Sequence, residues 1–106
     1  KTNLSKIIIT KNMGWCNDLR NKKNYNKLIK IQKNIKHEKL YRNDFKYDLM
    51  IPIEYNTKKR ILGKGSCIFL HLTNNLRPTA GCLALKKNDF LVMLKLIDKK
   101  TKIKIV

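Results

Sequence analysis

One histidine and one cysteine in the second half of the chain have the residue types of a base and a nucleophile. His71 lies within an apolar run, and Cys82 follows a polar loop and comes directly after Gly81. A cysteine attacks as its thiolate, which a neighbouring histidine favours by taking the proton. Gly81 leaves room for a substrate carbonyl, and main-chain N–H groups at Gly81 and Cys82 are placed to stabilise an oxyanion. These residue types indicate cysteine-dependent acyl transfer, or equally a core histidine and an inert buried thiol.

The other cysteines and histidines do not suggest a metal site. The chain has three cysteines, Cys16, Cys67 and Cys82, and an odd number cannot all pair within one chain. No two of them have the close spacing of a zinc knuckle, and the only histidines are His37 and His71. We therefore expect no metal and no cofactor. Cys16 is interpreted as structural, with a Cys16–Cys67 disulfide as the less favoured alternative.

The charge of the chain is strongly positive, with a formal net charge of +18 over 106 residues. Such a charge is typical of proteins that bind nucleic acid or other polyanions. However, 21 of the 25 basic residues are lysines, whereas arginine is better suited to bidentate contacts with phosphates and bases. Lysine, asparagine and isoleucine are all common in the chain and all have AT-rich codons, so codon bias with solvated lysines accounts for much of the charge. We therefore do not expect nucleic acid as the partner, and an anionic cell-wall polymer would satisfy the charge equally well.

The elements that must position His71 and Cys82 lie after Phe45. Residues 67–72 form a continuous apolar run, which predicts a buried strand. Residues 47–55 alternate between apolar and polar and predict another strand, which Pro52 would place at a sheet edge. A turn is expected at residues 64–66.

A polar loop over residues 73–79 follows the buried strand and leads to a short apolar segment at residues 81–85. We expect this loop to fold the two segments into a hairpin. A hairpin would bring His71 beside Cys82 despite their separation in the sequence.

The rest of the chain predicts one helix and little other regular structure. Residues 89–98 are amphipathic, and Asn88 and Asp89 favour a helix start. The apolar face of this helix consists of Phe90, Leu91, Leu94 and Ile97. Residues 102–106 alternate as a final strand, whereas residues 20–46 are expected to be largely irregular, with a short helix over 25–31. The predicted class is mainly β, with a short helical excursion and one C-terminal amphipathic helix.

Length and hydrophobicity predict a single domain over residues 1–106, since 42% of the residues are hydrophobic. The apolar run at residues 7–9 is too short for a secretory signal or a membrane span. Either the protein is not exported, or the start of an exported precursor is not in this chain.

Two neighbouring segments resemble the catalytic domain of the L,D-transpeptidases (YkuD type), in the branch with a Thr-x-Gly-Cys signature. They are residues 65–72, GSCIFLHL, and residues 78–85, PTAGCLAL. Residues 14–18, GWCND, are similar to a Gly-Trp-Cys-Asp-Asp segment of that branch. Further pairs match in order: Tyr25-Asn26, His37-Glu38, Tyr47-Asp48 and Tyr55-Asn56. The resemblance covers residues 13–106.

The resemblance implies a β-sandwich-like catalytic fold that lacks the family's upstream strands. It implies a peptidoglycan L,D-transpeptidase in the periplasm or cell envelope, which acts on peptidoglycan stem peptides without a cofactor. Cys82 would be the nucleophile, His71 the base, and Gly81 part of the oxyanion site. The residues expected on the substrate side are Trp15, Arg77, Thr79 and Ala80. From the residue types alone, Trp15 is interpreted first as a packing anchor, and Arg77 is either a contact for a substrate carboxylate or a solvated loop residue.

Two alanines depart from the more familiar signature of the family. Ala80 stands where those members have a second histidine, and Ala84 stands at a later polar position. Both differences bear on the recognition of a substrate carboxylate and leave the nucleophile in place. Two alternatives remain open: a non-catalytic basic module that binds nucleic acid or an anionic polymer, and an inactive fragment of the enzyme.

Overall fold

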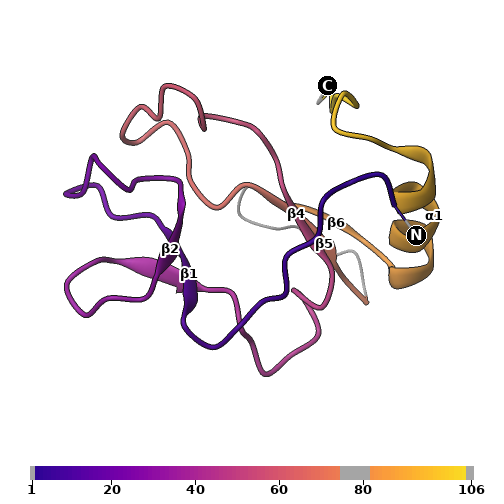
Figure 1. Ribbon diagram of the computed structural model, residues 1–106, viewed down its shortest axis with the longest axis horizontal. Helices are drawn as coiled ribbons and strands as arrows, with labels where there is room; N and C mark the ends of the chain where they lie inside the picture. Colours follow the sequence, from indigo (N-terminus) through magenta and orange to yellow (C-terminus); the bar gives the residue numbers. More distant parts are fainter. Residues whose placement is uncertain (1, 75–81, 105–106) are drawn as a thin grey trace.

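The computed structural model describes residues 2–74 and 82–104, which form two small sheets and one helix (Figure 1). Its Cα radius of gyration is 14.0 Å. The first sheet consists of β1 (Met13–Cys16), β2 (Leu28–Lys30) and β3 (His37–Lys39). The second consists of β4 (Met50–Pro52), β5 (Phe69–Leu72) and β6 (Leu83–Leu85), and α1 (Lys87–Leu96) follows it. The mainly β class predicted from the sequence is confirmed.

In the first sheet β1 is the central strand and pairs antiparallel with both β2 and β3. Trp15 is opposite Leu28 on one side and Glu38 on the other. The pairing continues beyond β1, because the Cys16 N–H donates to the Lys27 carbonyl and the Asn26 N–H donates to the Cys16 carbonyl.

The expectation for residues 20–46 is wrong in two respects. A strand, β2, stands where a short helix over 25–31 was predicted, and β3 lies in a segment predicted to be irregular. Asn26 explains the first difference, because its φ of 55° is left-handed and cannot continue a right-handed helix. The segment also contributes to the core, where Tyr25 and Leu40 are buried.

The side chain of Asn26 joins the first sheet to the long loop between β4 and β5. It accepts a hydrogen bond from Trp15 Nε1 at 2.8 Å and is itself buried. Its Nδ2 donates to the carbonyls of Tyr55 and Asn56 at 2.9 and 2.7 Å. The loop therefore extends towards β1 and β2 before it returns to β5 (Figure 1).

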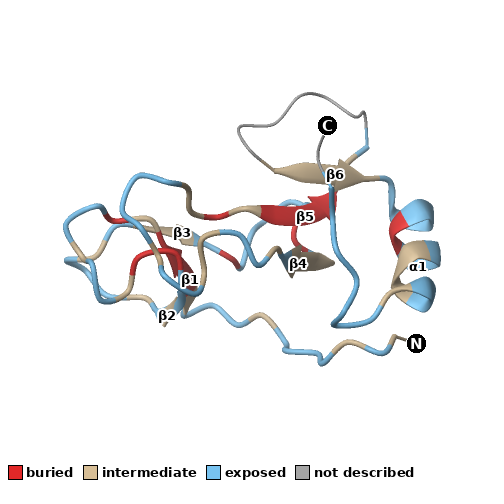
Figure 2. Cartoon of the chain, turned by 90° about the horizontal axis from the view of Figure 1, so that it is seen from above, coloured by how far each residue is buried: buried red, intermediate tan, exposed pale blue. Residues whose placement is uncertain are grey.

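In the second sheet β5 is central, and all four of its residues are buried (Figure 2). The buried strand predicted over 67–72 is therefore confirmed from Phe69 onward. β4 pairs antiparallel with β5 and is an edge strand, as Pro52 indicated, but it is shorter than the predicted 47–55. The turn predicted at 64–66 comes earlier, where the Lys64 N–H donates to the Ile61 carbonyl.

β6 pairs with β5 in parallel, with Leu70 opposite Leu83 and Leu72 opposite Leu85. The predicted hairpin is therefore wrong. Parallel strands require a connection that carries the chain back to the start of the first strand, whereas a hairpin does not. The Thr73 N–H donates to the Leu85 carbonyl at 2.9 Å and continues the pairing at the far end of β6.

The C-terminal helix was predicted over 89–98 and is observed from Lys87 to Leu96. Phe90 is its buried residue and packs with Leu70 and Leu72 of β5. The final strand predicted over 102–106 is wrong for residues 102–104, which are exposed and form no strand. Residues 105–106 lie outside the described part. An alternating pattern does not form a strand unless a neighbouring strand supplies hydrogen bonds.

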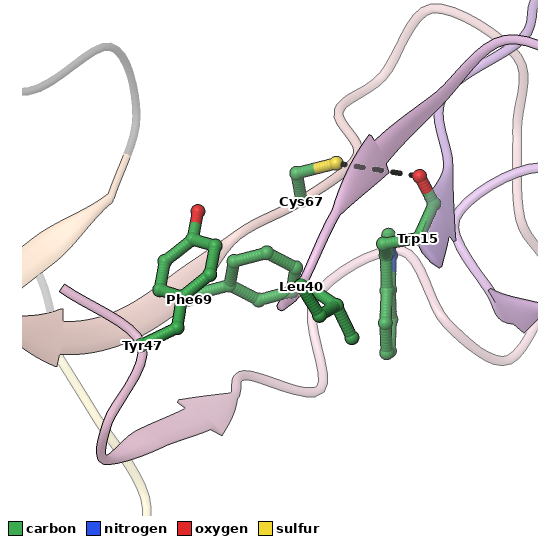
Figure 3. Close-up of a cluster of buried hydrophobic side chains, with 5 residues drawn as sticks. All are labelled: Trp15, Leu40, Tyr47, Cys67 and Phe69. Carbon is green, nitrogen blue, oxygen red and sulfur yellow. Dashed lines mark hydrogen bonds between the residues drawn. The ribbon is translucent and has the colours of Figure 1, made fainter. Parts of the chain in front are cut away.

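A second cluster of buried side chains lies on the opposite face of β5 and joins the two sheets (Figure 3). The ring of Phe69 meets the ring of Trp15 edge-on at 5.2 Å between centroids, and the ring of Tyr47 at 5.6 Å. Leu40 and Cys67 complete this cluster. β5 therefore has α1 against one face and the aromatic cluster against the other.

Within residues 2–74 and 82–104, no helix has the length and apolar character that a bilayer crossing would require.

Candidate active site

β5 contains His71, and Cys82 directly precedes β6, so both lie on one side of the second sheet. His71 is opposite Ala84, so the same register places Cys82 beside Phe69. Cys82 packs against the aromatic cluster that contains Phe69, and the ring of His71 lies 5.7 Å from the ring of Tyr47, a member of that cluster. His71 and Cys82 are thus diagonal neighbours on the same side of the sheet.

His71 has a defined tautomer. Its side chain is buried, and its Nδ1 lies 2.9 Å from the Leu72 carbonyl oxygen. A carbonyl oxygen only accepts, so Nδ1 carries the proton in the neutral ring and Nε2 has the lone pair. His71 is therefore prepared to accept a proton at Nε2 without help from a carboxylate.

The thiol of Cys82 is half-buried and donates to the Cys67 carbonyl oxygen at 3.1 Å. Burial raises the pKa of this thiol, and the nearby Glu38 carboxylate raises it further. The backbone N–H of Phe69 and the ammonium of Lys46 act in the opposite direction. Since the pKa is raised on balance, Cys82 rests as a thiol at neutral pH and needs a base before it can attack.

Cys67, whose carbonyl oxygen accepts from the Cys82 thiol, has an unusual backbone conformation. Its φ of 60° is left-handed, an uncommon conformation for a residue with a side chain and one that costs about 1 kcal/mol or more. Its thiol is buried and donates to the Trp15 carbonyl at 3.9 Å (Figure 3). Burial raises the pKa of the Cys67 thiol to about 12. All three cysteines are thiols, so the Cys16–Cys67 disulfide considered above is not formed.

Two residues of the site were not predicted as such from the sequence. Tyr47 donates its hydroxyl proton to the Glu38 carboxylate, and burial raises the pKa of Tyr47. His37, the residue before Glu38, has its Nδ1 hydrogen-bonded to the Ile35 carbonyl at 2.8 Å. In the sequence, Tyr47 and Glu38 are marked only as members of residue pairs that match the family in order. No local pattern predicts the hydrogen bond between them.

Trp15, expected on the substrate side, is a core residue with 9% of its surface exposed. Its ring packs on Phe69, and its Nε1 is hydrogen-bonded to Asn26. The other expected site residues lie outside the described part of the chain; they are Gly81, Arg77, Thr79 and Ala80.

Two hollows lie near the site. One, of about 680 Å³, runs beside the N-terminal segment and β4 and includes Trp15 and Phe90 in its lining. The other, of about 650 Å³, is open to solvent and is lined by Glu38 and by residues of the following segment up to Asp44. Among the described residues, no group of three or more His, Cys, Asp or Glu side chains is arranged to hold a metal ion.

The arrangement has the components of cysteine-dependent acyl transfer: a thiol, a buried imidazole with a defined tautomer, and a neighbouring carboxylate. Comparison with known proteins adds no identification, since no family model, no curated protein and no solved structure matches the chain.

Proposed function

We propose that the protein is a peptidoglycan L,D-transpeptidase with Cys82 as its nucleophile and His71 as its base. The observation that carries this proposal is the hydrogen bond from His71 Nδ1 to the Leu72 carbonyl. It leaves Nε2 as the acceptor of a histidine that lies on the same side of the sheet as Cys82. The sequence resemblance over residues 13–106 supplies the substrate class, peptidoglycan stem peptides, and a location in the periplasm or cell envelope.

The reaction begins with proton transfer from the Cys82 thiol to His71 Nε2. Because burial raises the pKa of Cys82, this transfer accompanies substrate binding and precedes attack, so His71 acts as a general base. The thiolate attacks the peptide carbonyl between the diamino acid and the terminal D-alanine of a tetrapeptide stem. His71 returns the proton to the departing D-alanine amine, and a thioester on Cys82 remains.

The second half of the reaction transfers the acyl group to an amine. A side-chain amine of another stem attacks the thioester carbonyl, the C–S bond breaks, and Cys82 recovers its proton. The product is a 3-3 cross-link. Water in place of the amine gives carboxypeptidase activity at the same site.

The proposal also includes the finer fold. Two small sheets that share an aromatic cluster are compatible with part of a β-sandwich-like catalytic domain. Trp15 then supports the site from the core, while Gly81, Thr79, Ala80 and Arg77 would meet the substrate.

Mass spectrometry after incubation with a carbapenem tests the proposal. A carbapenem is an acylating reagent for the cysteine of these enzymes, so we expect one adduct, located on the peptide that contains Cys82. Cys82→Ala should abolish the adduct, and His71→Ala should slow its formation by about 10²–10⁴-fold, the usual contribution of a general base. A folded protein that forms no adduct would overturn the enzymatic proposal, and an unchanged rate in His71→Ala would remove His71 as base.

A second candidate function is suggested by the net charge of +18, namely a basic module that binds an anionic polymer. It requires no chemistry at Cys82. A third reading, an inactive fragment, predicts that the chain alone shows no cooperative unfolding transition, which circular dichroism during heating would reveal.

A further inference from the structure

Glu38 is a carboxylate beside the proposed nucleophile that forms no salt bridge with another described residue. Its carboxylate accepts from the hydroxyl of Tyr47, and the Cys67 thiol is also within its hydrogen-bonding reach. The salt bridges among the described residues are Arg20–Asp18 and Arg42–Asp44, and neither includes Glu38. Glu38 is half-buried, and carboxylates that are partly removed from water are often paired with a cation.

The position of Glu38 is unfavourable for the first half of the reaction. Its negative charge opposes formation of the Cys82 thiolate and raises the pKa of that thiol. Glu38 therefore does not activate the Cys82 thiolate, and any role that it has in the reaction must lie in another step.

Glu38 also has access to solvent. It lines the open hollow of about 650 Å³ that continues along the 39–44 segment. The other carboxylate of this hollow, Asp44, is held by Arg42 through Nε at 2.8 Å and a terminal nitrogen at 2.6 Å. Arg42 also acts on the charge of Glu38 but forms no salt bridge with it, so Glu38 is the carboxylate of this hollow that remains for a cationic ligand.

We propose that Glu38 binds the side-chain ammonium of the acceptor stem peptide and orients it towards the thioester on Cys82. This inference rests on the proposed function and names the residue that receives its second substrate. The hollow would admit the acceptor from solvent, and Tyr47 would hold the carboxylate in place.

The chemistry requires the acceptor to lose two protons. The bound ammonium gives one proton to the Glu38 carboxylate as its nitrogen attacks the thioester carbonyl carbon and the C–N bond forms. The C–S bond then breaks, and the sulfur receives the second proton from the nitrogen through His71. Glu38 afterwards releases its proton to water, so the products are an amide, the Cys82 thiol and one proton.

The test measures what fraction of the acyl-enzyme reacts with the acceptor amine to give the cross-link and what fraction is hydrolysed by water. Wild-type protein is supplied with a tetrapeptide-stem donor and rising amounts of a tripeptide stem that ends in a diamino acid, and both products are quantified by chromatography. In Glu38→Gln we expect the ratio of cross-linked to hydrolysed product to fall at least about tenfold. Carbapenem acylation of Cys82 should stay equal or become faster, because a charge that opposes the thiolate is removed.

Two variants serve as matched controls. Asp44→Asn removes the other carboxylate of the hollow and should leave the ratio of cross-linked to hydrolysed product unchanged. Glu38→Asp keeps the negative charge, so its ratio should lie between those of Glu38→Gln and the wild-type protein. An unchanged ratio in Glu38→Gln, with acylation intact, would overturn the role of Glu38. Failure of wild-type protein to form any acyl-enzyme would instead overturn the proposed function.

A measurement on wild-type protein does not depend on the folding of any variant. A tripeptide stem whose side-chain amine is replaced by trimethylammonium cannot attack but keeps the charge, and its tert-butyl analogue has the same shape without charge. We expect the charged analogue alone to inhibit cross-linking competitively with the acceptor. Equal inhibition by both analogues, or by neither, would overturn a carboxylate site for the acceptor ammonium.

Discussion

At the scale of single residues, the pKa of Cys82 is set by influences that act in opposite directions. Glu38 and burial oppose the thiolate, whereas Lys46 and the Phe69 N–H favour it. The raised pKa that results means that the ionised fraction at pH 7 is lower than for an ordinary thiol, which has a pKa of about 8.5. In the proposed mechanism, His71 must therefore take the proton of the Cys82 thiol before the sulfur can attack.

The pH dependence of alkylation checks this statement. We expect the rate at which iodoacetamide modifies Cys82 to rise with pH and to reach half its maximum above about pH 8.5. Glu38→Gln should shift that midpoint downward, since it removes a neighbouring negative charge. Cys67, whose pKa is raised to about 12, is an internal control that should stay unmodified up to pH 10 when peptides are analysed separately. A midpoint for Cys82 below pH 8 would instead indicate a preformed ion pair with His71.

Asn26 is a second residue whose role is set by its exact contacts. Asn26→Ala would leave the Trp15 N–H and two loop carbonyls without their partner and would place alanine at a φ of 55°. A buried polar group without its hydrogen bond costs about 1–3 kcal/mol, and the left-handed conformation adds about 1 kcal/mol. We expect the free energy of unfolding in urea to fall by about 2–4 kcal/mol. Asn43→Ala, at an exposed position, should change it by less than about 0.5 kcal/mol.

At the scale of elements, Phe90 is the buried side chain through which α1 is attached to the second sheet, and Met93 and Leu94 pack partly buried beside it. Phe90 is 1% exposed and packs on Leu70 and Leu72, whereas Val92 on the same helix is 58% exposed. Phe90→Ala removes a fully buried ring, and such changes cost about 3–5 kcal/mol.

We therefore expect Phe90→Ala to lower the midpoint of thermal unfolding strongly, while Val92→Ala leaves it nearly unchanged. Circular dichroism of both variants, heated at the same protein concentration, measures the difference. Similar midpoints for the two variants would show that α1 contributes little to the stability of the second sheet.

The elements differ in how far local sequence predicts them. The apolar run at 67–72, the edge position indicated by Pro52 and the amphipathic segment at 89–98 each predict an element that the structure contains. Their signals are periodicity and backbone chemistry within a few residues. The strand at Leu28–Lys30 was not predicted, because its hydrogen bonds go to β1 and its own sequence is short and weakly periodic.

At the scale of the whole molecule, the net charge of +18 is the dominant property. A protein of this charge binds polyanions by releasing their counterions, so its affinity falls linearly with salt on a logarithmic scale. For an enzyme of the cell wall, the same charge would keep it near anionic polymers without any specific site.

We expect the protein to be retained on an immobilised anionic polysaccharide and to elute with rising sodium chloride. Cys82→Ala should elute at the same salt concentration, because its charge is unchanged. If binding were the whole function, cell-wall cross-linking would also be unaffected by Cys82→Ala. Elution of the wild-type protein that does not depend on salt would contradict a purely electrostatic interaction.

The sequence by itself determined the chemistry available to this chain: a thiol at Cys82, an imidazole at His71, an apolar run to bury the imidazole, and a large positive charge. These are properties of residue types and of patterns within one element. The tertiary structure decided that β6 runs parallel to β5, and that Glu38 and Tyr47 meet beside Cys82. Such relations depend on hydrogen bonds and packing between segments far apart in the chain, which no local pattern encodes.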